Sequence, residues 1–287
     1  MVSLKEQFKQ AVKKLEAAGN DNAEFDAGEL FEKAFGFGVT SPKAEQYTCE
    51  KGTLAFEMMI DKRAGGYPLQ YILGEWEFYG VPLKVGEGVL IPRQDTETLV
   101  ETVIRKNRNV PPVIIDLCSG SGCIALALEQ ELDAKMIFAV EKSKRAAEYA
   151  KENISLNSSS VCLTVGDCLD SEIIEGLPRA DMIVCNPPYL TNEDMESLQR
   201  EVTYEPREAL FGGEDGLDLY RDITRAYKGK LSHNGMLAFE VGHTQAEEVM
   251  EILIQAGLED VRAYEDYCGI KRVVLGFFTE KDHVKIY

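Results

Sequence analysis

The chain has 287 residues, of which 45% are hydrophobic, and its formal net charge at pH 7 is −18. This length fits one large domain or about two, and the apolar content is enough for a sizeable core. No stretch approaches the ~20 apolar residues of a membrane-spanning helix, so we expect no membrane span. The acidity disfavours nucleic acid as a partner, because it repels the phosphate backbone.

The start of the chain is charged and helical in pattern, and it lacks the apolar core of a signal peptide. The cysteines are odd in number and form no Cys-x-x-Cys pair: Cys49, Cys118, Cys123, Cys162, Cys168, Cys185 and Cys268. The three histidines are scattered, without metal-ligand spacing. We therefore expect a reduced, cytoplasmic protein that binds no metal.

The first part of the chain carries helical patterns and no strand signal. Residues 4–19 and 25–35 place apolar side chains at helical spacing, and a third such pattern covers residues 54–62. Ser3 is the expected N-cap of the first helix. We expect residues 1–66 to form a small all-α domain.

The pattern changes after this helical region. Aromatic and β-branched residues alternate over residues 71–85 around Gly80, which is typical of a β-hairpin. We expect residues 67–92 to connect two domains. A helix follows, with Asp95 or Thr96 as its expected N-cap.

From residue 93 to residue 287, strand and helix patterns alternate, which predicts an α/β domain with a parallel sheet covered on both faces. Ligands of such sheets bind beyond the carboxyl ends of the strands. The expected strands cover residues 113–116, 136–141, 161–165, 182–185 and 236–241, and a closing antiparallel pair covers residues 261–264 and 273–278. The long irregular stretch over residues 191–216 is a candidate lid or partner surface.

A glycine-rich loop joins the first of these strands to its helix, with the sequence Asp116-Leu117-Cys118-Ser119-Gly120-Ser121-Gly122. Its glycines allow a ligand to approach the backbone closely, and the following helix offers free N–H groups. Taken alone, the loop also fits the loose fingerprint of dinucleotide-binding proteins.

Acidic residues end the next two strands. Glu141 is placed to accept hydrogen bonds from both hydroxyls of a ribose, and Asp167 is placed to contact an adenine amine. Each acid singly is better explained as a surface carboxylate. Together with Asp116 and the glycine loop, they indicate a nucleoside site, for NAD or for another adenosine cofactor.

The fourth strand ends in Asn186-Pro187-Pro188-Tyr189, where two prolines force the chain out of the sheet. This turn can present the Asn186 side-chain carbonyl and the Pro187 main-chain carbonyl side by side, with the Tyr189 ring beside them. Two such acceptors suit a planar NH2 group, on an amide or on an aromatic amine. The alternative is a turn that only terminates the strand.

Hydride transfer has no use for such a grip, whereas methyl transfer to an NH2 nitrogen does. The glycine loop, Glu141, Asp167 and Asn186-Pro-Pro-Tyr189 together resemble the class I S-adenosylmethionine-dependent methyltransferases that act on planar nitrogens. Further stretches resemble the peptide chain release factor glutamine methyltransferases (the PrmC/HemK family). They are Pro68-Leu-Gln-Tyr-Ile-Leu-Gly74, Glu77-Phe78, Leu90-Ile-Pro-Arg-Gln-Asp-Thr-Glu97 and Tyr204-Glu-Pro-Arg-x-Ala-Leu210.

This resemblance covers roughly residues 68–278, and it implies a seven-stranded Rossmann-like sheet whose final strand is antiparallel. It also implies a partner-binding N-terminal domain and a methyltransferase domain over residues 93–287. The implied cofactor is S-adenosylmethionine. The implied substrate is the glutamine of the Gly-Gly-Gln motif in class 1 release factors.

Carried over by position, the residues from Cys118 through Ser119, Gly120, Ser121 and Gly122 line the methionine part of the cofactor. Glu141 binds its ribose, Asp167 and Cys168 flank its adenine, and the residues from Asn186 to Tyr189 grip the glutamine amide. Three residues depart from the family pattern. Cys118 replaces a common glycine, which is tolerated if its φ is not positive; Cys168 replaces a frequent aromatic residue, and Ile270 replaces a common asparagine.

Three rivals are open. An adenine-N6 nucleic-acid methyltransferase uses a similar tetrapeptide, but the acidity of the chain and the lack of a basic domain count against it. An NAD-dependent oxidoreductase leaves the tetrapeptide unexplained. A non-catalytic interaction module that keeps the methyltransferase fold is disfavoured by the intact tetrapeptide and strand-end acids.

Overall fold

The computed structural model describes residues 3–45 and 50–280, so Cys49 lies outside the described residues. The chain forms two compact units, which we call the helical unit and the sheet unit. They comprise, respectively, Met1–Trp76 with Gln199–Tyr204, and Glu77–Leu198 with Glu205–Tyr287. Within the described ranges, no helix combines the length and apolarity needed to cross a membrane.

The described elements of the N-terminal region are all helical, as the sequence predicts. They are α1 (Leu4–Ala17), α2 (Ala23–Phe35), the 3₁₀ helix η1 (Pro42–Glu45), α3 (Glu50–Ala64) and α4 (Leu69–Leu73). The Ser3 hydroxyl caps α1 by accepting a hydrogen bond from the Glu6 amide at 3.3 Å. Phe31 is fully buried in the core, where its ring meets those of Phe8 and Phe56 edge-on.

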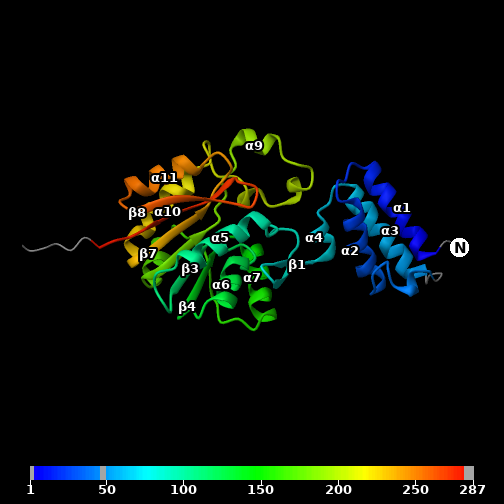
Figure 1. The fold of residues 1–287 in the computed structure, drawn as a ribbon, viewed down its shortest axis with the longest axis horizontal. Coiled ribbons are helices and arrows are strands. Elements are labelled where there is room, and N and C mark those ends of the chain that lie inside the picture. Colours follow the sequence, from blue (N-terminus) through cyan, green and yellow to red (C-terminus); the bar gives the residue numbers. More distant parts are fainter. Residues whose placement is uncertain (1–2, 46–49, 281–287) are drawn as a thin grey trace, which may run out of the picture. The chain divides into compact units, whose positions relative to one another are not determined.

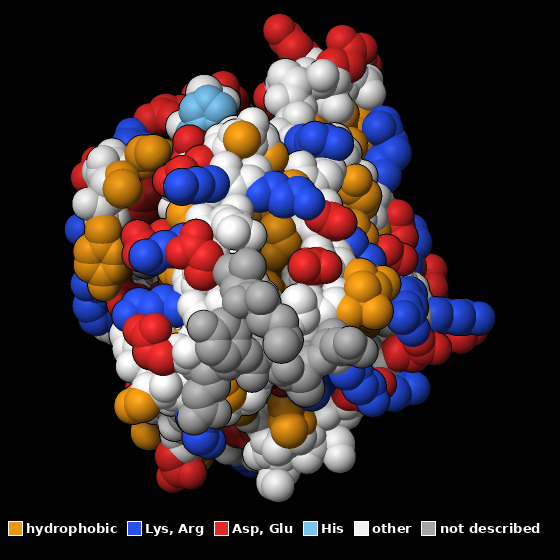
Figure 2. Space-filling model, turned by 90° about the vertical axis from the view of Figure 1, so that its right-hand side faces the viewer, with side chains coloured by type: hydrophobic (Ala, Val, Ile, Leu, Met, Phe, Trp, Pro, Cys, Tyr) orange, Lys and Arg blue, Asp and Glu red, His pale blue; other side chains and the backbone are white. Residues whose placement is uncertain are grey.

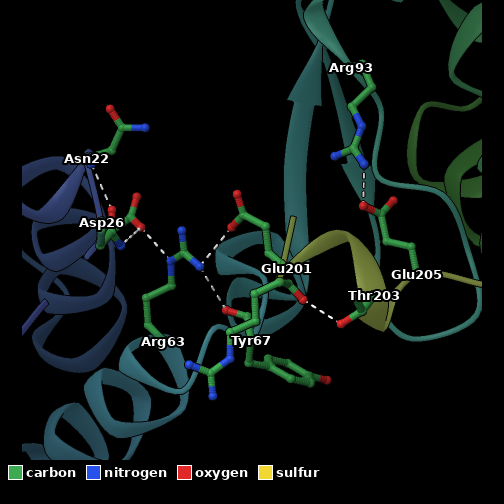
Figure 3. A network of polar contacts seen from close by, with 10 residues as sticks. Asn22, Asp26, Arg63, Tyr67, Arg93, Glu201, Thr203 and Glu205 are labelled. Carbon is green, nitrogen blue, oxygen red and sulfur yellow. Dashed lines mark hydrogen bonds and ion pairs between the residues drawn. The ribbon is translucent and has the colours of Figure 1, made fainter. Parts of the chain in front are cut away.

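A short segment from the second half of the chain, residues 199–204, also belongs to the helical unit. Figure 3 shows how Arg63 of α3 holds it: Nε lies 2.5 Å from Asp26 Oδ2, and Nη1 lies 2.8 Å from Glu201 Oε2. Asp26 is buried, so this arginine joins a buried carboxylate to a half-exposed one. The segment lies within residues 191–216, the stretch that the sequence marks as irregular.

The predicted hairpin is present but shorter than expected. β1 (Glu75–Phe78) and β2 (Val81–Lys84) pair around a turn, Tyr79-Gly80, whose residues both have positive φ. Such φ values are typical of tight two-residue hairpin turns. The prediction was wrong for residues 71–73, which are helical and belong to α4. This helix ends at Gly74, which takes the left-handed conformation that stops a helix.

The sheet unit contains seven strands in the order β5-β4-β3-β6-β7-β9-β8. The final strand is antiparallel to both of its neighbours, and the other pairs are parallel, as the family resemblance implies. The strands are β3 (Val113–Leu117), β4 (Met136–Glu141), β5 (Cys162–Val165), β6 (Ala180–Cys185), β7 (Leu231–Glu240), β8 (Glu259–Glu265) and β9 (Lys271–Phe277).

Helices cover both faces of this sheet: α6 and α7 lie on one face, and α10 and α11 lie on the other (Figure 1). The bounds are α5 (Gln94–Lys106), α6 (Cys123–Glu131), α7 (Lys144–Leu156), α8 (Ser171–Gly176), α9 (Asn192–Glu196), η2 (Val202–Tyr204), η3 (Arg207–Ala209), α10 (Asp218–Tyr227), η4 (Lys228–Lys230) and α11 (Ala246–Gln255). The predicted cap of α5 was wrong. Its N-cap is Arg93, and Asp95 and Thr96 lie inside the first turn, where Thr96 is buried.

Candidate functional site

A cavity of about 630 Å³ lies where β3, β4, β5 and β6 end, within the size range of small-molecule sites. Most of the predicted ligand-binding residues line it: Cys118, Ser119, Gly120, Ser121, Glu141, Asp167, Cys168 and Asn186, joined by Pro188. The predicted residues outside its lining are Asp116, Gly122, Pro187 and Tyr189. Most of the predicted residues at the strand ends therefore lie around one cavity, and the other four lie outside its lining.

The loop after β3 passes through three residues at positive φ, namely Cys118 (56°), Gly120 (56°) and Gly122 (81°). Glycine takes this conformation freely, whereas a residue with a side chain pays roughly 1–2 kcal/mol. A Cβ at Gly120 would meet no atom within 4 Å, so this backbone is open to an approaching ligand. The condition under which Cys118 would be tolerated is not met, because its φ is positive. Cys118 is therefore a strained residue in a turn that favours glycine.

Glu141 ends β4 and forms one wall of the cavity. Its carboxylate accepts hydrogen bonds from the Gly120 amide at 2.7 Å and from the Ser143 amide at 2.6 Å. Burial raises the pKa of Glu141 above its usual value, although these backbone donors lower it. Glu208 adds a third carboxylate to the lining, beside Glu141 and Asp167. The Gly120 amide already donates to the Glu141 carboxylate, so it is not free to bind a phosphate. The negative charge of the carboxylates also repels the diphosphate of a dinucleotide, so the site suits a neutral or cationic ligand.

Asp116 lies beneath the loop. It is fully buried, and its Oδ2 accepts a hydrogen bond from the Ala125 amide of α6 at 3.2 Å. Burial raises the pKa of Asp116 well above its usual value. Among the described residues its Oδ1 has no hydrogen-bond partner. From this position Asp116 joins the loop to α6, and direct contact with a cofactor stays a prediction.

The residues that follow β5 form another wall. Asp167 pairs with Lys142 across 2.8 Å and accepts a hydrogen bond from the Leu169 amide at 3.0 Å. Burial raises the pKa of Asp167 and the lysine lowers it, and the net effect is a lowered pKa. The Cys168 carbonyl accepts a hydrogen bond from the buried Tyr227 hydroxyl at 2.7 Å. This part of the wall is therefore fixed and keeps a charged carboxylate at its edge.

The turn Asn186–Tyr189 follows β6 and is held from behind. The side-chain amide of Gln245 donates a hydrogen bond to the Tyr189 carbonyl at 3.0 Å. A Cβ on Gly212 would lie 2.6 Å from the Pro188 carbonyl oxygen, so only glycine fits at this position. The turn therefore has a fixed backbone before any ligand binds, which is a requirement for precise positioning.

Tyr189 faces a second hollow of about 900 Å³, which it lines together with Arg93, Asp95, His243 and Arg272. Burial raises the pKa of Tyr189, so its phenol is neutral at pH 7. The turn thus has Asn186 and Pro188 on the cavity and Tyr189 on the second hollow. The two cavities therefore meet the turn at different residues.

Two buried polar residues near Asn186 were missed by the sequence analysis as site residues. Asn186 Nδ2 donates a hydrogen bond to Thr96 Oγ1 at 3.2 Å. Glu240, the last residue of β7, is also buried, and among the described residues its Oε2 has no hydrogen-bond partner. Burial raises the pKa of Glu240 to about 7. The available signal was a carboxylate inside the apolar strand of residues 236–241, which is costly unless it has a partner.

The strand order, the antiparallel final strand, the glycine loop after β3 and the acid that ends β4 define a class I methyltransferase. Solved structures of the same fold include the hMettl16 catalytic domain in complex with a MAT2A 3′UTR hairpin (TM-score 0.59, 18% identity, 80% of this chain and 84% of that chain). A methyltransferase from Pyrococcus furiosus is a second case (TM-score 0.54, 20% identity, 70% and 90%). At these identities, the likeness shows the fold alone.

Sequence comparisons identify the family. Residues 6–74 match the PrmC N-terminal domain and residues 94–214 match the methyltransferase small domain. The release factor glutamine methyltransferase of Vibrio cholerae is 35% identical over 288 residues, which is 98% of this chain and 99% of that protein. Its namesake from Thermodesulfovibrio yellowstonii is 42% identical over 224 residues, 76% of this chain and 78% of that protein. The chain belongs to the release factor glutamine methyltransferase family, as the sequence motifs predict.

Proposed function

We propose that this protein transfers a methyl group from S-adenosylmethionine to the glutamine side-chain amide nitrogen in the Gly-Gly-Gln motif of class 1 peptide chain release factors. Asn186 carries the proposal. It lines the cavity, its amide nitrogen is bonded to Thr96, and its carbonyl oxygen is the end left to grip a planar NH2 group. Family membership supports the same acceptor.

The residues of the cavity fit S-adenosylmethionine. The open backbone at Gly120 suits close approach of its methionine part, and Glu141 suits its ribose hydroxyls. Asp167 and Cys168 also line the cavity, and we assign them to its adenine. The carboxylates around the cavity favour a ligand that carries a positive charge. When bound, this cofactor supplies an electrophilic methyl group on a sulfonium sulfur.

The chain's own contribution is to orient the acceptor. The Asn186 side-chain oxygen and the Pro187 carbonyl accept the two N–H hydrogens, which aims the nitrogen and raises its electron density. Holding two reactants correctly contributes about 7–11 kcal/mol in the best cases. Tyr189 packs on the amide plane, and its neutral phenol is not a base. No strong base is required, because the amide proton becomes acidic only as the N–C bond forms.

The rival functions explain fewer of these features. A dinucleotide would bring its diphosphate to a loop whose Gly120 amide is bonded to Glu141. A nucleic-acid substrate would meet a chain of net charge −18. On the face in Figure 2, acidic and basic side chains are interspersed among the coloured residues and do not form a basic stripe. A non-catalytic module would not need the fixed tetrapeptide.

The helical unit is the proposed site of substrate docking. Phe25 of α2 and Leu54 and Met58 of α3 each expose more than half of their surface. A protein contact that covers these side chains would remove apolar surface from water. The proposed roles are partner binding for residues 1–66, connection for residues 67–92 and catalysis for the rest. A cytoplasmic location, where translation takes place, is part of the same proposal.

The test is mass spectrometry of an unmethylated release factor incubated with this protein and S-adenosylmethionine. We expect a gain of one methyl group, on the glutamine of the Gly-Gly-Gln peptide. DNA and tRNA are offered in parallel reactions as controls. A methylated nucleic acid with an unmodified release factor would replace the proposal by its rival.

A further inference from the structure

We infer that Asn153 of α7 is a positioning residue for the cofactor cavity, because its buried side chain joins two walls of that cavity. One wall is the glycine loop after β3, and the other is the chain that follows β2. The inference rests on the part of the proposed function that assigns the cavity to S-adenosylmethionine. Asn153 does not line the cavity, so it acts through the backbone of its partners.

Three hydrogen bonds link Asn153 to the two segments. The side chain is completely buried. Its Oδ1 accepts a hydrogen bond from the amide of Lys84, the last residue of β2, at 2.6 Å. Its Nδ2 donates to the Lys84 carbonyl at 3.1 Å and to the Ser121 carbonyl of the glycine loop at 2.9 Å. One side chain thus joins backbone groups that lie 69 and 32 residues away in the chain.

The partners determine which way the Asn153 amide faces. A backbone N–H only donates, so the Lys84 amide requires the side-chain oxygen. Backbone carbonyls only accept, so those of Lys84 and Ser121 require the side-chain nitrogen. Turning the amide over would break all three hydrogen bonds and leave buried polar groups unpaired. No ionisable side chain takes part, so the arrangement does not depend on the protonation of a carboxylate.

Other side chains of α7 extend the contact with the chain around β2. Four of them recur at every fourth position, which places them on one face of the helix: Arg145, Tyr149, Asn153 and Asn157. Asn157 Nδ2 donates to the Pro82 carbonyl at 2.9 Å. A Cβ on Gly86 would collide with the Tyr149 hydroxyl. Arg145 Nε donates to the Glu87 carbonyl at 3.3 Å. Residues 82–87 therefore run along this face of α7 in the opposite direction to the helix.

The same chain continues into the cavity wall. Its next residues, Gly88, Val89 and Leu90, line the cavity, and Ser121 lines it from the glycine loop. A ligand that fills the cavity contacts both segments. Because Asn153 bonds Lys84 and Ser121 at once, one wall cannot move without straining the hydrogen bonds to the other. A cofactor that fixes the loop therefore also fixes the end of β2.

Asn157 provides a matched control. Asn157→Ala removes a hydrogen bond from the same helix to the same strand and leaves the bonds to Lys84 and Ser121 in place. Asn153→Ala removes all three bonds. Asn153→Asp keeps the size of the side chain and the acceptor for the Lys84 amide, but it replaces the NH2 group that serves Ser121 by an oxygen. This variant breaks the link to the loop without emptying the site.

The first measurement is hydrogen exchange of the Lys84 backbone amide by NMR, with and without S-adenosylhomocysteine at ten times the Kd of each variant. Lys84 lies outside the cavity lining, yet we expect the ligand to slow its exchange in the wild type by about tenfold, the limit for an opening that abolishes binding. Asn157→Ala should keep this response, and Asn153→Asp should lose it. A wild type without the response, or an Asn153→Asp variant that keeps it, would overturn the inference.

The second measurement separates positioning from a purely structural role. Calorimetry gives the Kd for S-adenosylmethionine, and urea denaturation gives the free energy of unfolding. We expect the Kd to rise about tenfold in Asn153→Asp and Asn153→Ala, the equivalent of one hydrogen bond lost from the positioned loop, and to stay unchanged in Asn157→Ala. A lower free energy of unfolding with an unchanged Kd in the Asn153 variants would show that Asn153 only stabilises the fold, and would overturn the inference.

These measurements use no release factor, so they are independent of the proposed acceptor. A wild type that binds S-adenosylmethionine but methylates no release factor would refute the acceptor, and the Lys84 exchange would still decide the role of Asn153. A wild type that binds neither S-adenosylmethionine nor S-adenosylhomocysteine would refute the assignment of the cavity and the inference with it.

Discussion

The proposed cofactor side and the proposed acceptor side of the site are built in different ways. On the cofactor side, Glu141 is fixed by amides of Ser143 and Gly120, 2 and 21 residues away in the chain. On the acceptor side, Asn186 is fixed by a side chain 90 residues away, Thr96. A side chain fixed by nearby backbone depends mainly on its own loop. A side chain fixed by a distant side chain depends on how the helices and strands pack. A single substitution of the distant residue can therefore release it.

Removing the acceptor grip should have the largest effect. We expect Asn186→Ala to lower kcat for release factor methylation by about 10²–10³-fold, the usual effect of losing a positioned hydrogen-bonding group at a reaction centre. The Kd for S-adenosylmethionine should change only a few-fold, because the other cavity residues remain. Steady-state kinetics and calorimetry measure the two quantities. A kcat equal to that of the wild type would show that Asn186 does not position the acceptor.

The buried carboxylate behind the acceptor side should destabilise the protein at alkaline pH. The pKa of Glu240 is raised from 4.5 to about 7, so the folded state binds this proton more tightly than the unfolded state. The contribution of Glu240 to the free energy of unfolding therefore decreases as the pH rises from about 4.5 to 7 and stays low at higher pH. The total decrease is roughly 3 kcal/mol.

We therefore expect Glu240→Gln to raise the free energy of unfolding at pH 8, with a gain that disappears near pH 4.5. Urea denaturation at several pH values measures it. Glu251→Gln, which changes an exposed carboxylate of α11, is the control. An equal gain at both pH values would contradict the raised pKa.

The cofactor side should respond in affinity. Glu141→Gln removes the charge and half of the acceptor capacity, and we expect the Kd for S-adenosylmethionine to rise about 10–100-fold. At saturating cofactor, kcat should fall much less. Glu148→Gln, on the exposed surface of α7, is the matched control. A large loss of kcat with an unchanged Kd would show that the two sides are not separable.

The backbone of the acceptor turn should tolerate no added atom. Gly212→Ala places a methyl group 2.6 Å from the Pro188 carbonyl oxygen, which forces the turn to shift. We expect kcat to fall about tenfold, since misplacing a positioned group by a fraction of an ångström is costly. Gly176→Ala, which meets no atom within 4 Å, should leave kinetics unchanged. Similar kinetics for the two variants would mean that the turn adapts.

The smallest effect should come from Cys118. Cys118→Gly relieves the cost of its positive φ but adds backbone freedom to the unfolded chain. The two terms are each about 1 kcal/mol and oppose one another, so we expect unfolding free energy to change by less than about 1 kcal/mol. Chemical denaturation gives the value. A loss above about 2 kcal/mol would show that the thiol itself stabilises the loop.

The sequence identified much of the cavity lining because these residues follow apolar strands directly. Glu141, Asp167 and Asn186 each come at a strand end, and parallel strands bring such ends together. Thr96 and Glu240 escaped because their proximity depends on how α5 packs against β7. Asp95 and Thr96 looked like caps, since acids and threonines favour helix starts, but burial of Thr96 directs it to the core.

The segment over residues 199–204 limits how the helical unit can be exchanged between family members by recombination. The helical unit is discontinuous in sequence, so the chain passes between the two units at three peptide bonds. A chimera that takes residues 1–76 from one family member and the rest from another would pair Arg63 with a foreign residue in place of Glu201. Recombination at a single breakpoint therefore splits this unit, and intact inheritance requires residues 199–204 to travel with the N-terminal helices.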